Sequence, residues 1–170
     1  QSIAQELVLQ QQYLQGELID SIYFGGGTPS LLTEAELQLL LDTIYQHFPV
    51  SASPEITLEA NPDDLSLQKL HNLKDAGINR LSIGIQSFYE PHLRYLNRAH
   101  SATEASRCVQ QAQEVGFTNL SIDLIYAIPH PDHRIWEEDL ARAVALKPSH
   151  ISSYCLTIEE NTVFGRWLRH

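Results

Sequence analysis

Three consecutive glycines and a threonine, Gly25–Thr28, follow directly on the apolar run "SIYF". Glycine loses more backbone entropy on folding than any other residue, so a triplet indicates a chain that turns sharply or lies against another group. Ser30 stands where a G-x-G-x-x-G fingerprint needs glycine, and no Gly-Lys pair follows. A tight turn is one alternative, but the position behind a strand favours a ligand that contacts the backbone. Either a zwitterion, such as an amino acid, or a phosphate would suit such a loop.

Two carboxylates, Glu59 and Asp123, lie within otherwise apolar runs. Burial of an unpaired charge is costly, so each side chain is expected to bond to a neighbour or to a ligand. A helix cap or a buried pair would satisfy them equally. Arg98, in "YLNRAH", could hold a ligand carboxylate through two parallel hydrogen bonds, although on its own it would pass for a solvated surface residue.

Histidines and cysteines offer a further kind of chemistry. The segment "HPDHRIWEE" would provide His130, His133 and Glu137 as zinc ligands if it were helical. A proline separates the two histidines and the stretch is predicted to be a loop, so a solvated surface is the simpler interpretation. Cys108 and Cys155 are isolated, which fits a reducing cytoplasm and provides no C-x-x-C site. We therefore expect no metal site within these residues and a cytoplasmic location.

Strand and helix signals alternate along the chain. Strands are predicted at 18–24, 55–60, 79–86, 119–126 and 150–156, and helices at 2–15, 33–47, 66–77, 102–115 and 134–146. A T-x-x-E capping box opens the second helix. This order predicts an α/β fold with a parallel sheet and right-handed crossovers, either an open doubly wound sheet or a complete or partial (β/α) barrel. Strands of this type are expected to be covered on both faces.

Further polar residues end the predicted strands. They are Asn61, Gln86, Ser87, Tyr154, Cys155 and Thr157. In both architectures the ligand lies at the carboxyl ends of the strands. Together with the glycine loop and the two carboxylates, these residues predict one site at a single rim.

Composition narrows the classes of function. A chain of 170 residues with 43% hydrophobic content predicts one domain with a sizeable core. The formal net charge of −10 argues against a nucleic-acid surface, because phosphate binding needs clustered Lys and Arg. The sequence contains neither an apolar run long enough for a membrane span nor a signal-peptide pattern.

Six motifs in fixed order carry a resemblance to a known family. They are "FGGGTPSLL", "EITLEANPDD", "AGINRLSIGIQSF", "LNRAH", "NLSIDLIYAIP" and "ISSYCLTIEENTVF". Together they resemble the radical S-adenosylmethionine (SAM) family, in its oxygen-independent coproporphyrinogen III oxidase-like branch. The resemblance covers nearly the whole chain and implies a partial (β/α)6 barrel, with SAM lying across the strand ends.

The resemblance also implies a role for each matching residue. Gly26, Gly27 and Thr28 match the strip that meets the methionyl ammonium, and Glu59 matches the acidic group beside it. Three further positions complete the implied site: the glutamine after the third strand, the arginine that pairs with the methionyl carboxylate and the ribose-side aspartate, here Gln86, Arg98 and Asp123.

One defining feature of the family is missing from these residues. The C-x-x-x-C-x-x-C loop that holds a [4Fe–4S] cluster is absent, and two separated cysteines cannot replace it. The resemblance places this loop after a first strand, before Gln1, and the sequence contains no methionine. We therefore expect residues 1–170 to be an incomplete radical SAM core domain that lacks the cluster segment and a C-terminal domain. By itself it should be inactive.

Function divides within the branch. One group consists of haem chaperones, which bind haem and deliver it to haem-dependent respiratory proteins; the motifs "EANP", "GIQSF", "NRAH" and "LTIEENT" look more like this group. The alternative is a coproporphyrinogen III oxidase, which would use a 5′-deoxyadenosyl radical to abstract hydrogen from a porphyrinogen. An alternative of another class is a barrel that binds a sugar phosphate or nucleotide without radical chemistry.

A missing first strand would have a physical consequence. The strand at 18–24 would become a sheet edge with unpaired backbone groups, and only Asp20 places a charge on it. We expect the chain to self-associate through this edge.

Overall fold

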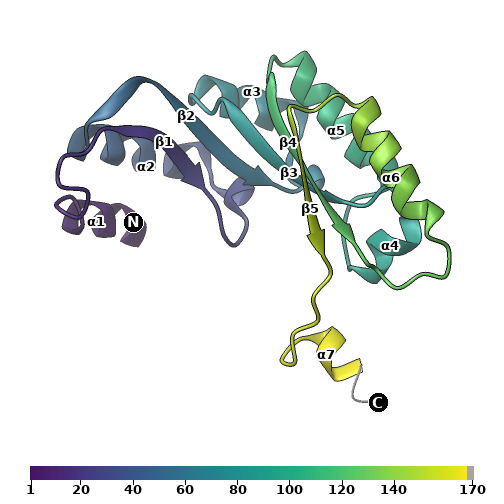
Figure 1. Ribbon diagram of the computed structural model, residues 1–170. Helices are drawn as coiled ribbons and strands as arrows, with labels where there is room; N and C mark the ends of the chain where they lie inside the picture. Colours follow the sequence, from purple (N-terminus) through teal and green to yellow (C-terminus); the bar gives the residue numbers. More distant parts are fainter. Residues whose placement is uncertain (168–170) are drawn as a thin grey trace.

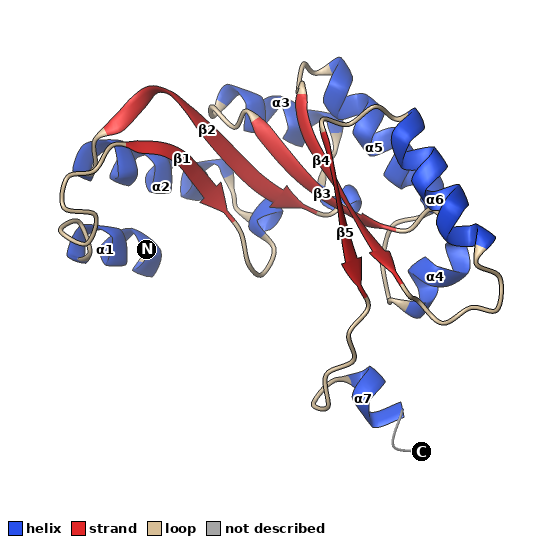
Figure 2. Cartoon of the chain, viewed as in Figure 1, coloured by secondary structure: helices blue, strands red, loops and turns tan. Residues whose placement is uncertain are grey.

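The structure is a computed structural model that describes residues 1–167 as one parallel β-sheet with its main helices behind one face (Figure 1). The strands are β1 (Ile19–Phe24), β2 (Val50–Ala60), β3 (Arg80–Gln86), β4 (Asn119–Tyr126) and β5 (His150–Cys155). They lie in chain order, and every neighbouring pair is parallel. The sheet curls across its width into a half-barrel (Figure 2). The predicted α/β fold and partial barrel are confirmed.

Helices precede the first strand, connect successive strands and follow the last one. They are α1 (Ser2–Leu9), α2 (Glu34–His47), α3 (Leu67–Asp75), α4 (Glu90–Tyr95), α5 (Ala102–Glu114), α6 (Arg134–Ala145) and α7 (Val163–Trp167), with short 3-10 helices η1 (Pro29–Leu31) and η2 (Pro62–Asp64). The predicted capping box opens α2, where the side chains of Thr33 and Glu36 satisfy each other's backbone N–H groups. A second capping box, formed by Ser101 and Glu104, opens α5.

The core lies between the convex face of the sheet and the helices. Leu58, Ile83 and Ile122, from the three central strands, are completely buried there. Leu70 of α3 and Val109 of α5 are equally buried and belong to the same cluster. Burial of these side chains fixes the sheet against its helices, because the hydrophobic contribution grows with the apolar area removed from water.

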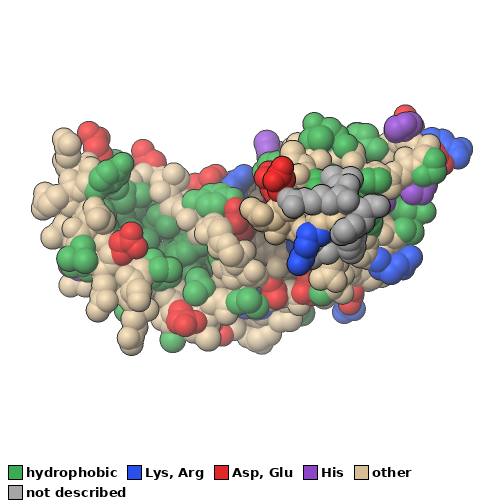
Figure 3. Space-filling model, turned by 90° about the horizontal axis from the view of Figure 1, so that it is seen from below, with side chains coloured by type: hydrophobic (Ala, Val, Ile, Leu, Met, Phe, Trp, Pro, Cys, Tyr) green, Lys and Arg blue, Asp and Glu red, His purple; other side chains and the backbone are tan. Residues whose placement is uncertain are grey.

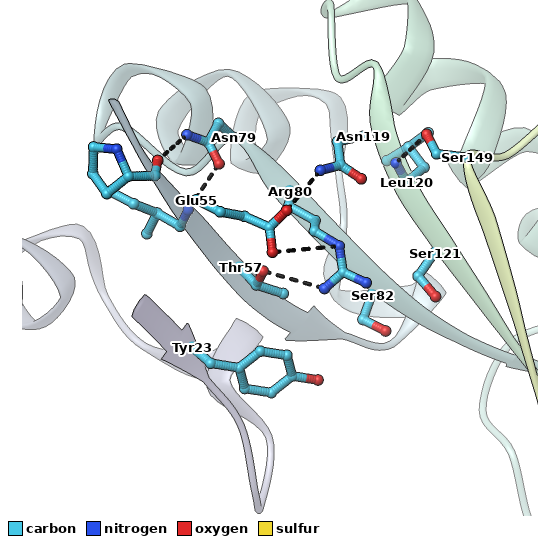
Figure 4. A network of polar contacts seen from close by, with 12 residues as sticks. Tyr23, Glu55, Thr57, Asn79, Arg80, Ser82, Asn119, Leu120, Ser121 and Ser149 are labelled. Atoms are coloured by element: carbon cyan, nitrogen blue, oxygen red, sulfur yellow. Dashed lines mark hydrogen bonds and ion pairs between the residues drawn. The ribbon is translucent and has the colours of Figure 1, made fainter. Parts of the chain in front are cut away.

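The concave face of the sheet is polar, and this corrects one expectation from the sequence. Tyr23, Thr57, Ser82 and Ser121 project to the same side from four different strands (Figure 4). Tyr23 is 57% exposed. The strands are therefore packed against helices on one face only, and their side chains alternate between core and cavity.

Glu55 anchors a polar network at the amino-terminal end of this concave face. Its carboxylate accepts a hydrogen bond of 3.0 Å from Asn119 and lies 4.0 Å from Nε of Arg80. Arg80 also donates to the hydroxyl oxygen of Thr57 at 3.2 Å (Figure 4). The network joins β2, β3 and β4 on the amino-terminal side of the cavity that lies at the carboxyl ends of the strands.

Some predicted boundaries are wrong. The first helix ends at Leu9 rather than at residue 15, and the chain continues through turns to Gly16. Tyr13 is 79% exposed, so little packing is available to extend the helix. Strand β2 begins five residues earlier than predicted, at Val50, where it pairs with Ile19 of β1.

The outer surface shows an uneven distribution of charge. Figure 3 shows the molecule from below, and at the end formed by α1 and β1 it shows acidic and hydrophobic side chains without Lys or Arg. No helix within residues 1–167 combines the length and the apolar character needed to cross a bilayer.

Candidate functional site

A cavity of about 360 Å³ opens at the carboxyl ends of the strands. It brings together most of the residues assigned from the sequence: Gly27, Thr28, Glu59, Gln86, Arg98 and Asp123 all line it. Gly26 adjoins them, and its backbone N–H donates to Oε2 of Glu59 at 3.0 Å. Parallel strands deliver their last side chains to the same edge, which explains how residues so distant in sequence share one cavity.

The glycine loop turns because two of its residues have left-handed backbone conformations. Gly26 has φ of 77° and Gly27 has φ of 62°, values that side chains rarely tolerate. The turn directs the Gly26 N–H to Glu59 and brings Gly27 and Thr28 to the cavity.

Each cavity carboxylate is held by a hydroxyl on the preceding strand. Tyr23 of β1 donates from Oη to Oε1 of Glu59 at 2.7 Å. Ser82 of β3 donates from Oγ to Oδ2 of Asp123 at 2.9 Å, and Ser121 donates to Oδ1 at 3.4 Å. Burial and the hydrogen bond to Glu59 raise the pKa of Tyr23 to about 12, so its hydroxyl remains a donor at neutral pH.

Arg98 enters the cavity from the segment between α4 and α5. Its Nη2 donates to the carbonyl oxygen of Gly84 at 3.2 Å, whereas its Nε is buried without a hydrogen-bond partner. Burial lowers the pKa of Arg98, and the nearby Asp63 carboxylate opposes that effect. A guanidinium stays charged even so, and an unsatisfied buried donor favours an acceptor from a ligand.

Gly84 and Gln86 shape the cavity beside this guanidinium. A Cβ at Gly84 would lie 2.8 Å from Nε2 of Gln86 and 3.0 Å from Nη2 of Arg98. Gln86 has φ of 68°, at an irregularity in the pairing of β3 with β4. Gly84 therefore leaves space for the Arg98 guanidinium, and the irregular backbone changes the direction of the Gln86 side chain.

A buried histidine supports the Arg98 segment from behind. His100 is 3% exposed, and its Nε2 lies 3.1 Å from the carbonyl oxygen of Ile85, to which it donates. Its Nδ1 lies 3.6 Å from Oδ1 of Asp63. These contacts fix the chain two residues beyond Arg98 to β3 and η2.

Not every residue predicted for the rim faces the cavity. Ser87 is completely buried, and its Oγ donates to Oδ2 of Asp139 at 2.5 Å, behind the sheet. The N–H of Phe88 donates to the other oxygen of Asp139 at 2.7 Å. Of the three residues predicted at the end of the fifth strand, Tyr154 lines the cavity, whereas Cys155 and Thr157 do not.

The histidine-rich loop borders a second cavity, of about 260 Å³, between β4, α4 and α6. Nδ1 of His130 accepts a hydrogen bond from the N–H of Asp132, and its ring lies edge-on to that of His92. Within residues 1–167, no three His, Cys, Asp or Glu side chains are arranged to hold one metal ion. Burial lowers the pKa of His92, whose Nε2 has no hydrogen-bond partner.

Three contributors to the site were missed from the sequence: Tyr23, Ser82 and Gly84. An isolated glycine within a strand signals a close approach by another group, so Gly84 could have been found. Ser82 shares the face of Gly84 and Gln86 by the two-residue period of a strand. Tyr23 gave no signal, because its partner lies on another strand.

Comparison with known proteins assigns the family. Residues 2–142 match the Radical SAM superfamily. The chain belongs to the radical SAM superfamily. This radical SAM chain is 42% identical over 153 residues to the heme chaperone HemW of Escherichia coli (strain K12). It is 40% identical over 147 residues to the heme chaperone HemW of Bacillus subtilis (strain 168). These alignments cover 90% and 86% of this chain but only 40% and 39% of the relatives.

Solved structures agree with this assignment. The coproporphyrinogen III oxidase HemN from Escherichia coli, described as a radical SAM enzyme, superposes with a TM-score of 0.85 and 30% identity, over 96% of this chain and 38% of that one. The archaeal Elp3 of Methanocaldococcus infernus shares the fold, with a TM-score of 0.75 at 19% identity. The chain is therefore a partial radical SAM barrel of the HemW/HemN-like branch.

Membership of the superfamily implies SAM and a [4Fe–4S] cluster. The residues present fit SAM but not the cluster. The guanidinium of Arg98, which lines the cavity and for which Gly84 leaves space, fits a ligand that carries a carboxylate. The two cysteines do not fit a cluster, because Cys108 is buried within α5 and Cys155 ends β5.

Proposed function

We propose that this chain is the SAM-binding part of a haem chaperone similar to HemW. The observation that carries the proposal is the cavity at the strand ends, where an unpartnered arginine donor, two held carboxylates and a glycine loop converge. Superfamily membership favours SAM over a sugar phosphate as the ligand. Because the chain spans about 40% of the length of its relatives, the activity and partners of the whole protein are proposals too.

Each side of the cavity would hold a different part of SAM. Glu59 and the glycine loop would bind the methionyl ammonium, since a carboxylate and backbone groups suit a cation with three donors. Arg98 would pair with the methionyl carboxylate, assisted by the amide of Gln86. Asp123 would accept hydrogen bonds from the ribose hydroxyls. The ammonium and the carboxylate of SAM lie on the same carbon atom, so Glu59 and Arg98 would together hold the amino-acid end and Asp123 the ribose, which fixes the direction in which the ligand lies.

SAM supplies a sulfonium centre whose carbon–sulfur bond can be cleaved by one electron. The contribution of this chain is binding and orientation. Ser82 and Ser121 hold the carboxylate of Asp123, and the contacts of His100 hold the segment that carries Arg98. Side chains fixed in this way lose little entropy on binding, so the ligand meets a pre-organised site.

SAM binding is tested by calorimetry on the full-length protein with SAM and with S-adenosylhomocysteine. Asp123→Asn keeps the shape of the side chain but removes its charge and one acceptor, and we expect about tenfold weaker binding. Asp42→Asn, on the exposed surface of α2, is the matched control and should leave the affinity unchanged. Unchanged affinity in Asp123→Asn would show that the site has been assigned wrongly.

Haem is the proposed cargo because the relatives that this chain matches are named heme chaperone. We expect the full-length protein to bind haem, measured by absorbance titration, and not to decarboxylate coproporphyrinogen III when SAM and a reductant are supplied. The second candidate is an oxidase, favoured by the superposition with HemN. Product formation at enzyme-like rates would select the oxidase, and haem binding without turnover would select the chaperone.

A further inference from the structure

Both carboxylate oxygens of Glu59 accept a hydrogen bond, one from β1 and one from the glycine loop that follows β1. Oε1 accepts from the Tyr23 hydroxyl at 2.7 Å, and Oε2 accepts from the Gly26 N–H at 3.0 Å. An ionised carboxylate offers about four lone-pair positions, so capacity remains on both oxygens for a ligand in the cavity that Glu59 lines. The two donors thus fix the plane of the carboxylate and leave lone-pair positions on both oxygens for a ligand.

The first glycine of the triplet makes this arrangement possible. A Cβ at Gly25 would lie 2.5 Å from Cε1 and 2.9 Å from Cδ1 of the Tyr23 ring, and 3.2 Å from Oε1 of Glu59. Gly26 and Gly27 are needed for their backbone conformation, whereas Gly25 is needed for the space its missing side chain leaves. The triplet therefore allows the chain to turn and leaves the space that the Tyr23 ring occupies.

We infer that Tyr23 is a positioning residue, which holds the Glu59 carboxylate toward the ammonium end of the ligand. The inference rests on the proposed SAM site. The Tyr23 side chain is 57% exposed and lies outside the hydrophobic core, so its role is not core packing. A phenylalanine at this position would keep the ring and release Oε1 of Glu59.

The test uses the full-length protein carrying Tyr23→Phe, with two ligands that differ in the group that Glu59 would meet. S-adenosylhomocysteine has the amino-acid moiety, and 5′-methylthioadenosine lacks it. We expect affinity for S-adenosylhomocysteine to fall about fivefold to tenfold, as for one lost hydrogen bond, and affinity for 5′-methylthioadenosine to stay unchanged. Tyr13→Phe is the matched control, because Tyr13 is 79% exposed and lies away from the cavity.

A second measurement does not need a ligand. When Tyr23 no longer holds Glu59, the Gly26 amide should lose its steady acceptor and exchange its hydrogen faster, as seen by NMR. If the wild-type protein binds neither ligand, the proposed SAM site fails, and faster Gly26 exchange in Tyr23→Phe still supports the positioning role. Unchanged Gly26 exchange, unchanged affinity for S-adenosylhomocysteine or an equal loss for both ligands would overturn it.

Discussion

Gly84 and Arg98 fit each other closely: Nη2 of Arg98 donates to the Gly84 carbonyl oxygen at 3.2 Å, and a Cβ at Gly84 would approach the same nitrogen to 3.0 Å. The strand thus provides both an acceptor and the space for the guanidinium. The amide of Gln86 fills the other side of that space, 2.8 Å from the same Cβ position.

Gly84→Ala should impair binding more than folding. The added methyl group meets the ends of two flexible side chains, which can move at little cost, but their displacement takes Arg98 and Gln86 out of place. We expect about tenfold weaker binding of S-adenosylhomocysteine by calorimetry. In an Arg98→Ala background the same change should cost less, since one displaced partner is already gone. An equal cost in both backgrounds would contradict the proposed coupling.

Arg98→Lys should weaken binding despite keeping the charge. A lysine ammonium cannot form two parallel hydrogen bonds to a carboxylate, and its reach differs from that of a guanidinium. We expect affinity for S-adenosylhomocysteine to fall by about tenfold or more. Arg107→Lys, at an exposed position on α5, is the control. Equal affinities for the two variants would show that Arg98 does not contact the ligand.

Asp139→Ala should destabilise the fold without touching the cavity at the strand ends. The change leaves the Ser87 hydroxyl and the Phe88 N–H without their acceptor, at a cost of roughly 3 kcal/mol in the free energy of unfolding. Asp139→Asn keeps an acceptor and should cost less. Denaturant titration at neutral pH would measure both, and equal losses would contradict this account.

The same carboxyl group predicts a pH dependence. Burial raises the pKa of Asp139 above its usual value of 3.8, against the opposing hydrogen bond from Ser87. The folded state therefore holds this proton more tightly than the unfolded chain does. The resulting stabilisation is complete below pH 3.8 and is lost as the pH rises through the folded-state pKa. Asp139→Asn should lack this contribution, and parallel pH profiles for the two proteins would contradict it.

The 170-residue chain should self-associate through β1. Within residues 1–167 this strand pairs with β2 alone, so its other edge exposes unpaired backbone groups that can pair with another chain. Sedimentation at rising concentration should show larger species, and Ser21→Lys, which adds a charge to β1, should reduce them. Ser53→Lys, on β2, is the control. A strictly monomeric chain with slow amide exchange along 19–24 would show that the edge is covered.

The same chain should not assemble a [4Fe–4S] cluster when supplied with iron and sulfide under anaerobic conditions. Burial raises the pKa of the Cys108 thiol to about 12, with a smaller effect from Asp63, so this sulfur is held as a thiol. Cys155 is exposed but has no thiolate partner beside it within residues 1–167. A stoichiometric cluster with the electron paramagnetic resonance signal of a reduced centre would overturn this prediction.

The sequence by itself determined the order of the elements, the parallel sheet and most residues of the rim. These features depend on local signals: the period of apolar residues, the capping boxes and polar residues at strand ends. Because parallel strands end at one edge, the convergence of Glu59 and Asp123 follows from their positions along the chain, whereas Arg98 reaches the same cavity from the segment between α4 and α5. The family resemblance gave the same positions their proposed roles.

Only the tertiary structure decided which groups meet. The register pairs Tyr23 with Thr57 and Ser82 with Ser121, so each hydroxyl lies diagonally across from a carboxylate two residues further along the next strand, Glu59 or Asp123. The backbone irregularity at Gln86 precedes Ser87, which points behind the sheet to Asp139 instead of into the cavity. Contacts between residues far apart in sequence depend on how the whole chain packs, so they become definite only in the folded molecule.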